Sequence, residues 1–549
     1  MSDVYRPPEF SVPIDLDLSR NEGRPTVTEM PFAPGEVADL TSRYPDTSRL
    51  RRVVADRHGI PEARVLVTAG GDDALFRCFL SIAGGPVVAT TPSFEMIRRY
   101  AAQTRSPLIE VPWWGGDFPL NDFVRIDADL AVVVSPNNPT GSTIGPADLR
   151  KIAGEFPLVL LDAAYTDFAD EDLTPTALEA ENVAVVRTLS KAFGLAGMRV
   201  GYLLGPDDLV ERISTFGSPY SLSSLSARVA ADALARDDGS VAEFVSAVAG
   251  ERNLLFSLLG GLGCAPLPSQ ANFVLATDVD ATWLVSGAAS LGIGLRRFED
   301  EALARCVRIG LPGDLDAFRR LHRTLQSVLA PEALLFDMDG VLADVGGSYR
   351  RAIIDTAASF GVGLTASDVA AAKAAGDASD DWGLTRRLCA SRGVEVPFAE
   401  VRATFERIYQ GDSGLPGLKT TETPMVDPKR LEAWAKRFRL GVVTARPRRD
   451  AEEFLERFGL ARFFSTVVTR EDAPAKPDPA PIRLALDRLG ATTAWMVGDT
   501  VDDLRAARAA GVVPIGLLAP GDEPAALSGA ATILADLNDL EEVLDVTKM

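Results

Sequence analysis

Residues 183–199 read VAVVRTLSKAFGLAGMR, and this stretch decides how the first half of the chain is interpreted. Its first four residues are apolar, which is typical of a strand buried on both faces of a parallel sheet. Lys191 follows this strand directly after Ser190, while Thr188 precedes the pair and Arg199 comes eight residues later. A nearby cation and removal from water both favour a neutral, nucleophilic lysine. The stretch therefore predicts a Schiff-base lysine beside a phosphate.

Three earlier segments repeat the pattern of an apolar run followed by polar residues. Residues 130–134 (LAVVV) precede SPNNPTG at 135–141, and residues 158–161 (LVLL) precede DAAY at 162–165. Near residue 70, VTAGGDD has the composition of a strand, a glycine turn and the start of a helix, which offers backbone N–H groups to a phosphate. Since parallel strands carry site residues at their carboxyl ends, we expect these segments to meet in one site.

Composition and charge limit the classes of function. The chain has 549 residues, of which 46% are hydrophobic and 24% charged, as in folded soluble proteins. Its net charge of −21 disfavours nucleic acid as a partner. We find no apolar run long enough to span a membrane and no signal peptide at the start, so we expect a cytoplasmic protein. With four scattered cysteines and two histidines, neither a zinc site nor Ser-His-Asp hydrolysis is expected.

Residues from about 15 to 329 resemble the fold-type I pyridoxal-phosphate aminotransferases, most closely the histidinol-phosphate aminotransferase branch. SPNNPTG, DAAY and TLSKAFGLAGMRVG occur in the order of that family, and Tyr44-Pro45-Asp46 matches its YPD segment. The resemblance implies that Lys191 holds pyridoxal 5′-phosphate covalently and shuttles a proton. It implies that Asp162 pairs with the pyridine nitrogen, while Asn138 and Tyr165 bond the ring oxygen.

The resemblance also implies the other contacts of the cofactor and the substrate. Phe94 would stack on the ring, and Tyr44 would reach the cofactor phosphate of a second subunit, which implies a homodimer through this domain. The expected phosphate cradle consists of Gly70, Gly71, Asp72, Thr188, Ser190 and Arg199. The expected substrate-binding residues are Asn21, Arg296 and Arg308, since an arginine fork suits a carboxylate or a phosphate.

A second constellation begins at residue 333, where ALLF leads into DMDGVL. Asp337 and Asp339 stand two residues apart at the end of this strand, so one can attack phosphorus while the other exchanges a proton with the leaving oxygen. VTAR with Thr444, KPDP with Lys476, and GDTVDD at 498–503 follow in order. A hydroxyl, a lysine and clustered carboxylates that bind a hard divalent cation are the requirements of phosphoryl transfer.

These four segments resemble the motifs of the haloacid dehalogenase superfamily of phosphatases over residues 333–549. The resemblance implies that Asp337 is the nucleophile, that Asp339 is the general acid and base, and that Thr444 and Lys476 bind phosphate. It implies an Mg²⁺ site made by Asp337, the backbone at Asp339, Asp499 and Asp503. True dehalogenases lack the second aspartate, so a phosphatase or phosphomutase is preferred.

The expected fold is α/β throughout and has two domains. Residues 1–330 would form the fold-type I aminotransferase, with a large cofactor domain at about 40–225 and a small domain from the N-terminal segment and about 226–330. Residues 331–549 would form a Rossmann-like haloacid dehalogenase core with a helical cap at about 345–425. Cap residues Lys373, Asp380, Asp381 and Trp382 are candidates to reach the substrate.

Two complete sites on one chain predict consecutive reactions. The leading hypothesis is amination of a small phosphorylated ketone, with an amino acid such as glutamate as donor, followed by Mg²⁺-dependent dephosphorylation of the amine. Histidinol phosphate is the first candidate, although the cap differs from the zinc loop of the histidinol-phosphatase branch. The alternatives are another phosphorylated amino alcohol or amino sugar, a phospho-amino-acid decarboxylase-like first domain, or one silent, regulatory domain.

Overall fold

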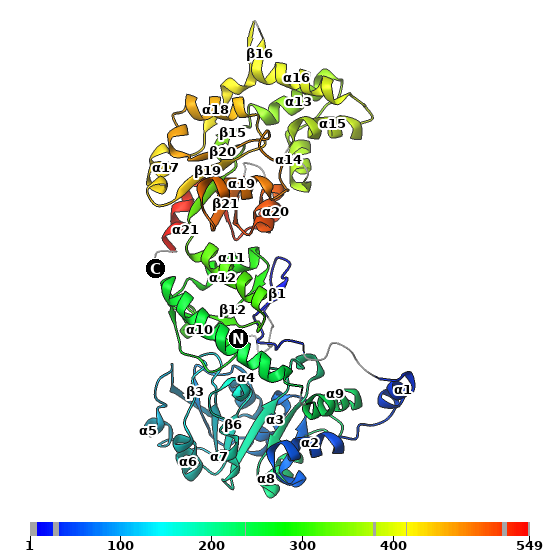
Figure 1. Cartoon of the computed structure of the whole chain (residues 1–549), viewed down its shortest axis with the longest axis vertical. Helices are drawn as coiled ribbons and strands as arrows, with labels where there is room; N and C mark the ends of the chain where they lie inside the picture. The colour runs from blue at the N-terminus through cyan, green and yellow to red at the C-terminus, as the bar shows by residue number, and fades with distance from the viewer. Residues whose placement is uncertain are drawn as a thin grey trace. The chain divides into compact units, whose positions relative to one another are not determined.

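The computed structural model describes residues 8–25, 32–236, 238–376, 380–412, 414–518 and 524–546. It divides into two compact units, the first made mainly of residues 17–279 and 295–319 and the second of residues 9–16, 280–294 and 320–549. Each unit is built on its own α/β sheet (Figure 1). Among the described residues, every helix is too short or too polar to cross a membrane.

The first unit contains a seven-stranded mixed sheet in the order β2-β8-β7-β6-β5-β3-β4. All neighbours are parallel except β8, which is antiparallel to both β2 and β7. The strands are β2 (Val65–Thr68), β3 (Val87–Thr91), β4 (Leu108–Pro112), β5 (Leu130–Val134), β6 (Val159–Asp162), β7 (Val183–Thr188) and β8 (Gly201–Leu204). Strands β5 to β7 are fully buried, as their continuous apolar runs predict.

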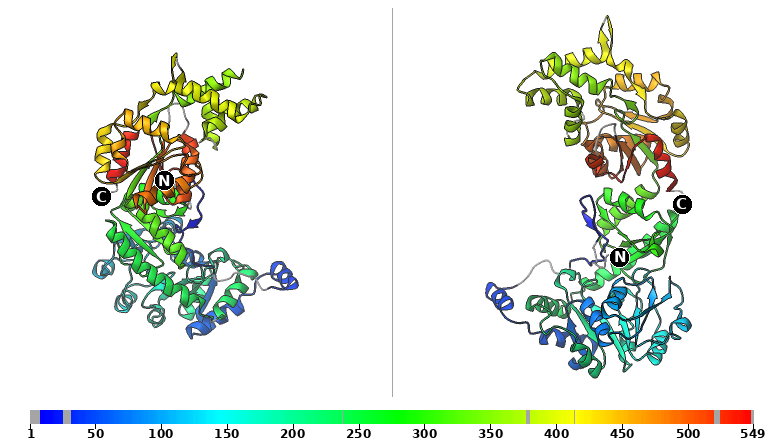
Figure 2. Two further views of the ribbon diagram at one scale, coloured as in Figure 1. Left: turned by 45° about the horizontal axis from the view of Figure 1, so that its top comes forward. Right: turned by 180° about the vertical axis from the view of Figure 1, so that it is seen from behind.

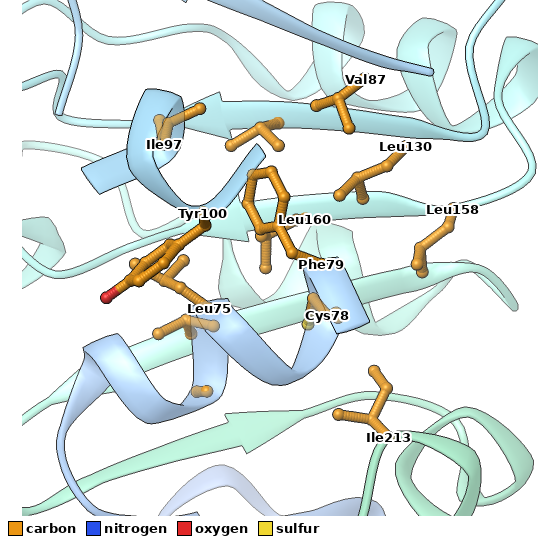
Figure 3. Packing of buried hydrophobic residues seen from close by; sticks show 14 of the residues in the cluster. Leu75, Cys78, Phe79, Val87, Ile97, Tyr100, Leu130, Leu158, Leu160 and Ile213 are labelled. Carbon is orange, nitrogen blue, oxygen red and sulfur yellow. The ribbon is translucent and has the colours of Figure 1, made fainter. Parts of the chain in front are cut away.

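Helices cover this sheet and enclose its core. Leu75, Cys78 and Phe79 of α3 pack against strand residues such as Leu130 and Leu160 (Figure 3). The buried face of α3 fixes the position of its first turn, which belongs to the candidate site. The helices from the start of the described chain to the one that follows β8 are α1 (Pro34–Ser42), α2 (Ser48–His58), α3 (Gly71–Ser81), α4 (Met96–Thr104), α5 (Leu120–Phe123), α6 (Pro146–Glu155), α7 (Thr174–Leu178) and α8 (Asp207–Ser214).

A smaller antiparallel sheet completes the first unit. Its order is β12-β13-β10-β9, and its strands are β9 (Ala265–Pro266), β10 (Phe273–Thr277), β12 (Arg296–Arg297) and β13 (Val307–Gly310). Helices α9 (Ser224–Ala235) and α10 (Ser240–Gly261) precede it, and α10 packs against β9 and β10.

The second unit is built on a six-stranded parallel sheet in the order β20-β19-β14-β21-β22-β23. The strands are β14 (Ala333–Phe336), β19 (Arg439–Val443), β20 (Thr466–Val468), β21 (Ala494–Gly498), β22 (Val513–Leu517) and β23 (Thr532–Leu534). The helices of this core are α17 (Pro428–Ala435), α18 (Arg448–Arg457), α19 (Ala480–Leu489), α20 (Val501–Ala510) and α21 (Leu540–Val546). The strand expected from the apolar run ALLF at residue 333 is thus confirmed as β14.

A helical insertion interrupts this core after β14, at the place of the expected cap, and is called the cap below. Its helices are α13 (Tyr349–Ser359), α14 (Ala366–Ala375), α15 (Asp381–Ser391) and α16 (Phe398–Gln410), and they gather at one end of the unit (Figure 2). The short strands β16 (Gly411–Asp412) and β17 (Leu415–Pro416) follow α16. The chain enters the cap along β15 (Ala343–Asp344) and leaves it along β18 (Thr423–Pro424), and these strands pair antiparallel. We call this pair the cap hinge.

Helices α11 (Ala281–Ser290) and α12 (Leu315–Leu329) precede β14, and α11 packs against β22 and β23. The indole rings of Trp283 and Trp495 lie 4.7 Å apart, and both donate a hydrogen bond to carbonyls of α12, at Val328 and Ser327. The second unit therefore begins before residue 330, because these helices share its core. The short strands β1 (Leu16–Asp17) and β11 (Ile293–Gly294) pair with each other.

Candidate functional sites

The first site is a cavity of about 370 Å³ at the carboxyl ends of the strands of the large sheet. Lys191 lies just after β7, and its Nζ donates to the Arg20 carbonyl at 3.2 Å and lies 5.6 Å from the Tyr165 ring. Most of the residues expected at this site do line the cavity, namely Gly71, Asp72, Phe94, Asn138, Asp162, Tyr165, Thr188, Ser190, Lys191 and Arg199. Gly70 comes immediately before this wall, at the N-terminus of α3.

One end of this cavity is shaped to receive an anion. Gly70 has a φ of +85°, and a Cβ there would lie 2.8 Å from an Arg199 nitrogen, so glycine lets the turn approach the arginine. Arg199 donates to Asp72 at 3.1 Å, and the Thr188 hydroxyl donates to the Ser190 hydroxyl at 2.9 Å. The N-terminus of an eleven-residue helix, two hydroxyls and a guanidinium are the groups that a phosphate prefers.

Asp162 ends β6 at the cavity wall and is almost completely buried. Burial raises the pKa of its carboxyl to about 7, although a hydrogen bond from the Ala164 N–H opposes this shift. A buried carboxylate gains from a cationic hydrogen-bond donor. The protonated ring nitrogen of pyridoxal phosphate is such a donor, so the residues present fit this cofactor.

The expected anion-binding arginines differ in position. Arg308 on β13 is buried and donates to Asn138 Oδ1 and to the Ser19 carbonyl, both at 2.6 Å, which brings it beside the cavity wall. Arg296 on β12 pairs with Glu95 at 3.5 Å and lies over the Phe298 ring, outside the cavity lining. A substrate contact of Arg296 stays a prediction.

Asn21 and Tyr44 come from segments before the large sheet. Asn21 is buried with a φ of +53°, and its amide donates to the Tyr165 hydroxyl at 3.3 Å. Within the part of the chain that the structure describes, its Oδ1 has no hydrogen-bond partner. Tyr44 is 80% exposed and stacks on Tyr220 at 4.5 Å, away from the cavity lining. An exposed Tyr44 suits a contact with a second subunit, which stays a prediction.

The second site lies at the carboxyl end of β14. The carboxylates of Asp337, Asp499 and Asp503 come within 4.8 Å of one another, which is the spacing of a metal site. Lys476 Nζ lies 2.6 Å from Asp337 and 2.5 Å from Asp503. A hard divalent cation suits such an all-oxygen set, so these residues fit Mg²⁺.

Burial shifts the pKa values of Asp337 and Asp499, and their charged neighbours modify these shifts. Burial raises the pKa of Asp337 to about 7, with Asp503 and Asp339 adding to the rise and Lys476 opposing it. Burial also raises the pKa of Asp499 well above its usual range. Burial disfavours the Lys476 ammonium, yet Asp337 and Asp503 hold its pKa above the ordinary value. A divalent cation would stabilise all three carboxylates in their charged form.

Asp339 and Thr444 lie at the same end of the sheet, and both accept a hydrogen bond from Arg446. The Asp339 carboxylate accepts from Arg446 at 2.6 Å and does not belong to the three-carboxylate cluster. The Thr444 hydroxyl accepts from the Arg446 N–H at 3.1 Å. A metal contact of Asp339 through its backbone, and a phosphate contact of Thr444, stay predictions.

Gly340 explains how the strand can turn beside the three-carboxylate cluster. Its φ is +76°, and a Cβ there would lie 2.1 Å from Asp499 Oδ2. Only glycine accommodates both the conformation and the proximity of the carboxylate. The glycine of the DMDGV motif therefore lets the chain turn close to Asp499, beside the two aspartates that the motif supplies.

Sequence reasoning missed several residues at these sites. Arg20 and Glu22 line the first cavity, and their position beside Asn21 was the available signal. Arg350 lies 3.5 Å from Asp499, and Glu422 pairs with Arg446. No motif marked either of these two residues. Of the cap candidates, Lys373 pairs with Asp381 at 3.1 Å, and Arg470 lies 4.0 Å from the Trp382 ring and 3.5 Å from Asp380.

Comparison with protein families assigns both halves. The family described as aminotransferase class I and II matches residues 37–316, which is just over half of the chain. The chain belongs to this family. The haloacid dehalogenase-like hydrolase family matches residues 331–511. The chain is therefore an enzyme in which an aminotransferase is fused to a haloacid dehalogenase-like hydrolase, as the motifs predict.

Curated relatives cover different shares of the chain. An imidazoleglycerol-phosphate dehydratase of Phytophthora nicotianae is 47% identical over 198 residues, which is 34% of this chain and 44% of that protein. An aromatic amino acid aminotransferase of Corynebacterium jeikeium is 34% identical over 59% of this chain and 93% of that protein. A histidinol-phosphate aminotransferase of a Mycobacterium species is 31% identical over 63% of this chain and 94% of that protein.

A solved structure supports the fold of the aminotransferase half. Histidinol-phosphate aminotransferase from Sinorhizobium meliloti in complex with pyridoxal-5′-phosphate has a TM-score of 0.51 and is 26% identical. The match covers 58% of this chain and 91% of that chain. The fold-type I expectation is thereby confirmed.

Proposed function

We propose that this bifunctional enzyme aminates a small phosphorylated ketone and then hydrolyses the phosphate ester of the amine product. The observation that carries the proposal is the presence, on one chain, of an intact lysine site with an anion cradle and an intact DxD site with a carboxylate cluster. An inactive regulatory domain has no need for either set of chemical groups.

At the first site, we assign binding and proton transfer to the chain's own residues. Pyridoxal phosphate bound there would accept the amino group and delocalise the electron pair that remains when the Cα proton leaves. Lys191 Nζ, free to move from the Arg20 carbonyl, would take and return that proton. Arg308 would exchange its bond to Asn138 for the anionic group of the substrate.

At the second site, Asp337 would attack phosphorus and form an aspartyl-phosphate. Lys476, already 2.6 Å from Asp337, would hold the phosphoryl group, and Mg²⁺ at the carboxylate cluster would neutralise its charge. Asp339 would give its proton to the leaving alkoxide, and the resulting carboxylate would accept a proton from the water that attacks phosphorus and releases Asp337.

The relatives support histidinol phosphate as the first candidate for the amine. Two of the proteins named above are histidinol-phosphate aminotransferases, and a third is named for a phosphorylated imidazole compound. Loss of water from a phosphorylated glycerol group gives a phosphorylated ketone, which is the class of substrate that we propose for Lys191. The amino donor would be an amino acid such as glutamate, and the working form a homodimer in the cytoplasm.

Phosphate release from a panel of amines tests this proposal. Histidinol phosphate, phosphoserine and serinol phosphate would be compared, each with Mg²⁺ and with a chelator. We expect strong preference for one of them, and loss of activity with the chelator. Preference for histidinol phosphate would support the first candidate, and preference for another amine would name a different product. Equal, slow cleavage of every phosphate ester would contradict the proposal.

A further inference from the structure

The guanidinium of Arg446 is enclosed between two carboxylates in the second unit. Its side chain has no exposed surface, and its Nε donates to Asp339 at 2.6 Å. Its terminal nitrogens donate to the two oxygens of Glu422 at 3.0 and 3.3 Å. The rings of Tyr349 and Phe454 lie 4.8 and 5.4 Å from the guanidinium carbon. The arginine therefore has one fixed orientation, and that orientation determines where the Asp339 carboxylate lies.

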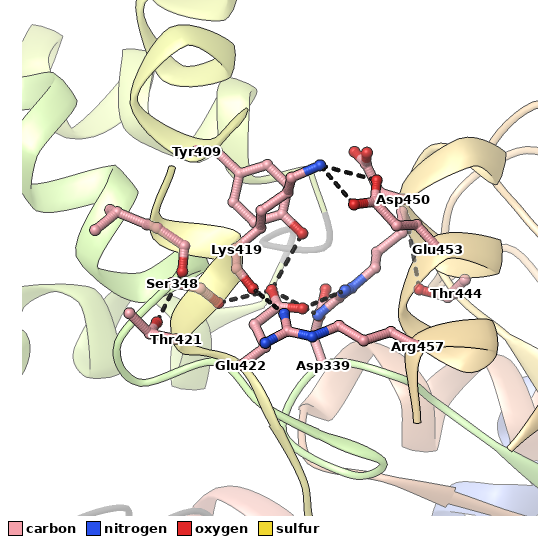
Figure 4. A network of polar contacts seen from close by, with 12 residues as sticks. Asp339, Ser348, Tyr409, Lys419, Thr421, Glu422, Thr444, Asp450, Glu453 and Arg457 are labelled. Carbon is pink, nitrogen blue, oxygen red and sulfur yellow. Dashed lines mark hydrogen bonds and ion pairs between the residues drawn. The ribbon is translucent and has the colours of Figure 1, made fainter. Parts of the chain in front are cut away.

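Glu422 is in turn held by residues of the cap and its connections. It lies immediately before β18 of the cap hinge, and it accepts from the Ser348 hydroxyl at 2.8 Å and from the Tyr409 hydroxyl at 3.1 Å (Figure 4). Ser348 follows β15, the other hinge strand, and Tyr409 is in cap helix α16. Both chain connections to the cap thus meet at one carboxylate.

The charges of this network depend on one another. Burial raises the pKa of Glu422, and Arg446 opposes that rise. Burial disfavours the charge of Arg446, but Asp339 and other neighbours hold its pKa above the ordinary value. A buried charge without its partner is strongly unfavourable, so displacement of Glu422 with the hinge would force Arg446 to shift as well.

We propose that Arg446 and Glu422 are positioning residues, which hold Asp339 in the orientation for proton transfer and make that orientation depend on the cap hinge. This inference rests on the proposed phosphatase function, in which Asp339 protonates the leaving oxygen. It assigns a role to two residues that belong neither to the three-carboxylate cluster nor to the residues expected to bind phosphate.

The leaving group of the substrate separates this role from simple structural support. An alkoxide must receive a proton as the phosphorus–oxygen bond breaks, whereas p-nitrophenolate leaves as the anion. A misplaced Asp339 therefore slows formation of the aspartyl-phosphate from an alkyl phosphate much more than from an aryl phosphate. General damage to the site slows both equally.

The experiment measures single-turnover release of the alcohol from serinol phosphate and of p-nitrophenol from p-nitrophenyl phosphate, with excess full-length enzyme and Mg²⁺. For Arg446→Met we expect a loss of about 100-fold or more with the alkyl ester and at most about tenfold with the aryl ester. Glu422→Gln should show the same selectivity with a smaller loss. Arg446→Lys keeps the positive charge but not the planar, bidentate guanidinium, so its loss with the alkyl ester should be only partly smaller than that of Arg446→Met.

A matched control is Arg457, the last residue of core helix α18, which contacts the segment just before Glu422. Arg457 donates to the carbonyls of Lys419 and Thr420 at 3.2 and 3.1 Å but does not contact Asp339. Arg457→Met should leave the ratio of the two rates unchanged. Thermal unfolding checks that each variant is folded, and if Arg446→Met does not fold, Arg446→Lys and Glu422→Gln carry the test.

The outcomes distinguish the inference from the function on which it rests. Failure of the wild type to cleave either ester, with Mg²⁺ present, would overturn the proposed phosphatase function. Cleavage of both esters by the wild type, with equal losses for both in the Arg446 and Glu422 variants, would overturn the positioning role alone.

Discussion

At the scale of single residues, Asp162 links the stability of the first unit to its cofactor. Without the cofactor, burial holds the pKa of this carboxyl at about 7, above its usual value of 3.8. The folded protein then prefers the neutral carboxyl. The unfolding free energy is therefore highest at pH values below the pKa of this group in the unfolded chain, and it falls as the pH rises towards 7. With a cationic ring nitrogen beside it, the charged form would be preferred instead.

Asp162→Asn removes this ionisation. In cofactor-free protein, we expect the wild type to lose on the order of 3 kcal/mol more unfolding free energy between pH 5 and pH 8 than the variant. Urea unfolding at both pH values measures the difference. The variant should also bind pyridoxal phosphate more weakly. Parallel pH curves for the two cofactor-free proteins would contradict this account of Asp162.

Gly340 provides a second prediction at this scale. Gly340→Ala would place a Cβ 2.1 Å from Asp499 Oδ2, so the carboxylate must move and the metal cluster must change. We expect roughly 10- to 100-fold weaker Mg²⁺-dependent phosphatase activity, with the aminotransferase unaffected. Gly361→Ala is the control, because Gly361 has a similar φ of +81° but, apart from its chain neighbours, no atom of the described residues lies within 4 Å of such a Cβ. Similar losses in both variants would refute the role of the contact with Asp499.

The residues that could be predicted from sequence are those in contiguous motifs. Asp337 and Asp339, or Ser190 and Lys191, share a few residues of chain, so strand and turn geometry alone brings them together. Arg446 stands in a motif, but its partner Asp339 is 107 residues away. Glu422 has no motif, because its role depends on how the cap returns to the core. Such contacts come from tertiary structure, which local pattern does not contain.

At the scale of elements, strands β5, β6, β7 and β14 were predicted, because a continuous apolar run followed by polar residues is typical of a buried parallel strand. The antiparallel strand β8 and the hinge pair β15–β18 were not predicted. The hinge strands have only two residues each, so they carry no periodicity, and their pairing depends on the cap between them. The shared core of α11, α12 and β22 was also missed, because the apolar pattern of a helix does not show which sheet the helix packs against.

The contact between α11 and the six-stranded sheet predicts a large loss of stability when the side chain of Trp495 is truncated. Trp495 is completely buried, packs on Trp283 and donates to Ser327. Trp495→Ala should lower the unfolding free energy of the second unit by about 3–5 kcal/mol. Chemical unfolding, with phosphatase activity as the signal, measures this loss. Phe398→Ala is the control, because Phe398 lies in the same unit, is 38% exposed and should change stability little when truncated. A loss below about 1 kcal/mol for Trp495→Ala would contradict the shared core.

At the scale of the whole molecule, two separate catalytic sites predict that each can be lost alone. Lys191→Ala should abolish amination and leave phosphate release from the amine substrate unchanged. Asp337→Asn should abolish phosphate release and leave the absorbance of bound pyridoxal phosphate unchanged. Measuring both activities in both variants checks this independence. Loss of both activities in either folded variant would contradict it.

The order of the two reactions is the central claim, and phosphate release from the phosphorylated ketone tests it most directly. The ketone of the preferred amine would be mixed with the wild-type enzyme and Mg²⁺, with and without glutamate. We predict phosphate release only with the amino donor, after a lag in which the amine accumulates, and none with Lys191→Ala. Rapid release from the ketone without a donor would show that the phosphatase acts before or independently of amination, and would contradict the account.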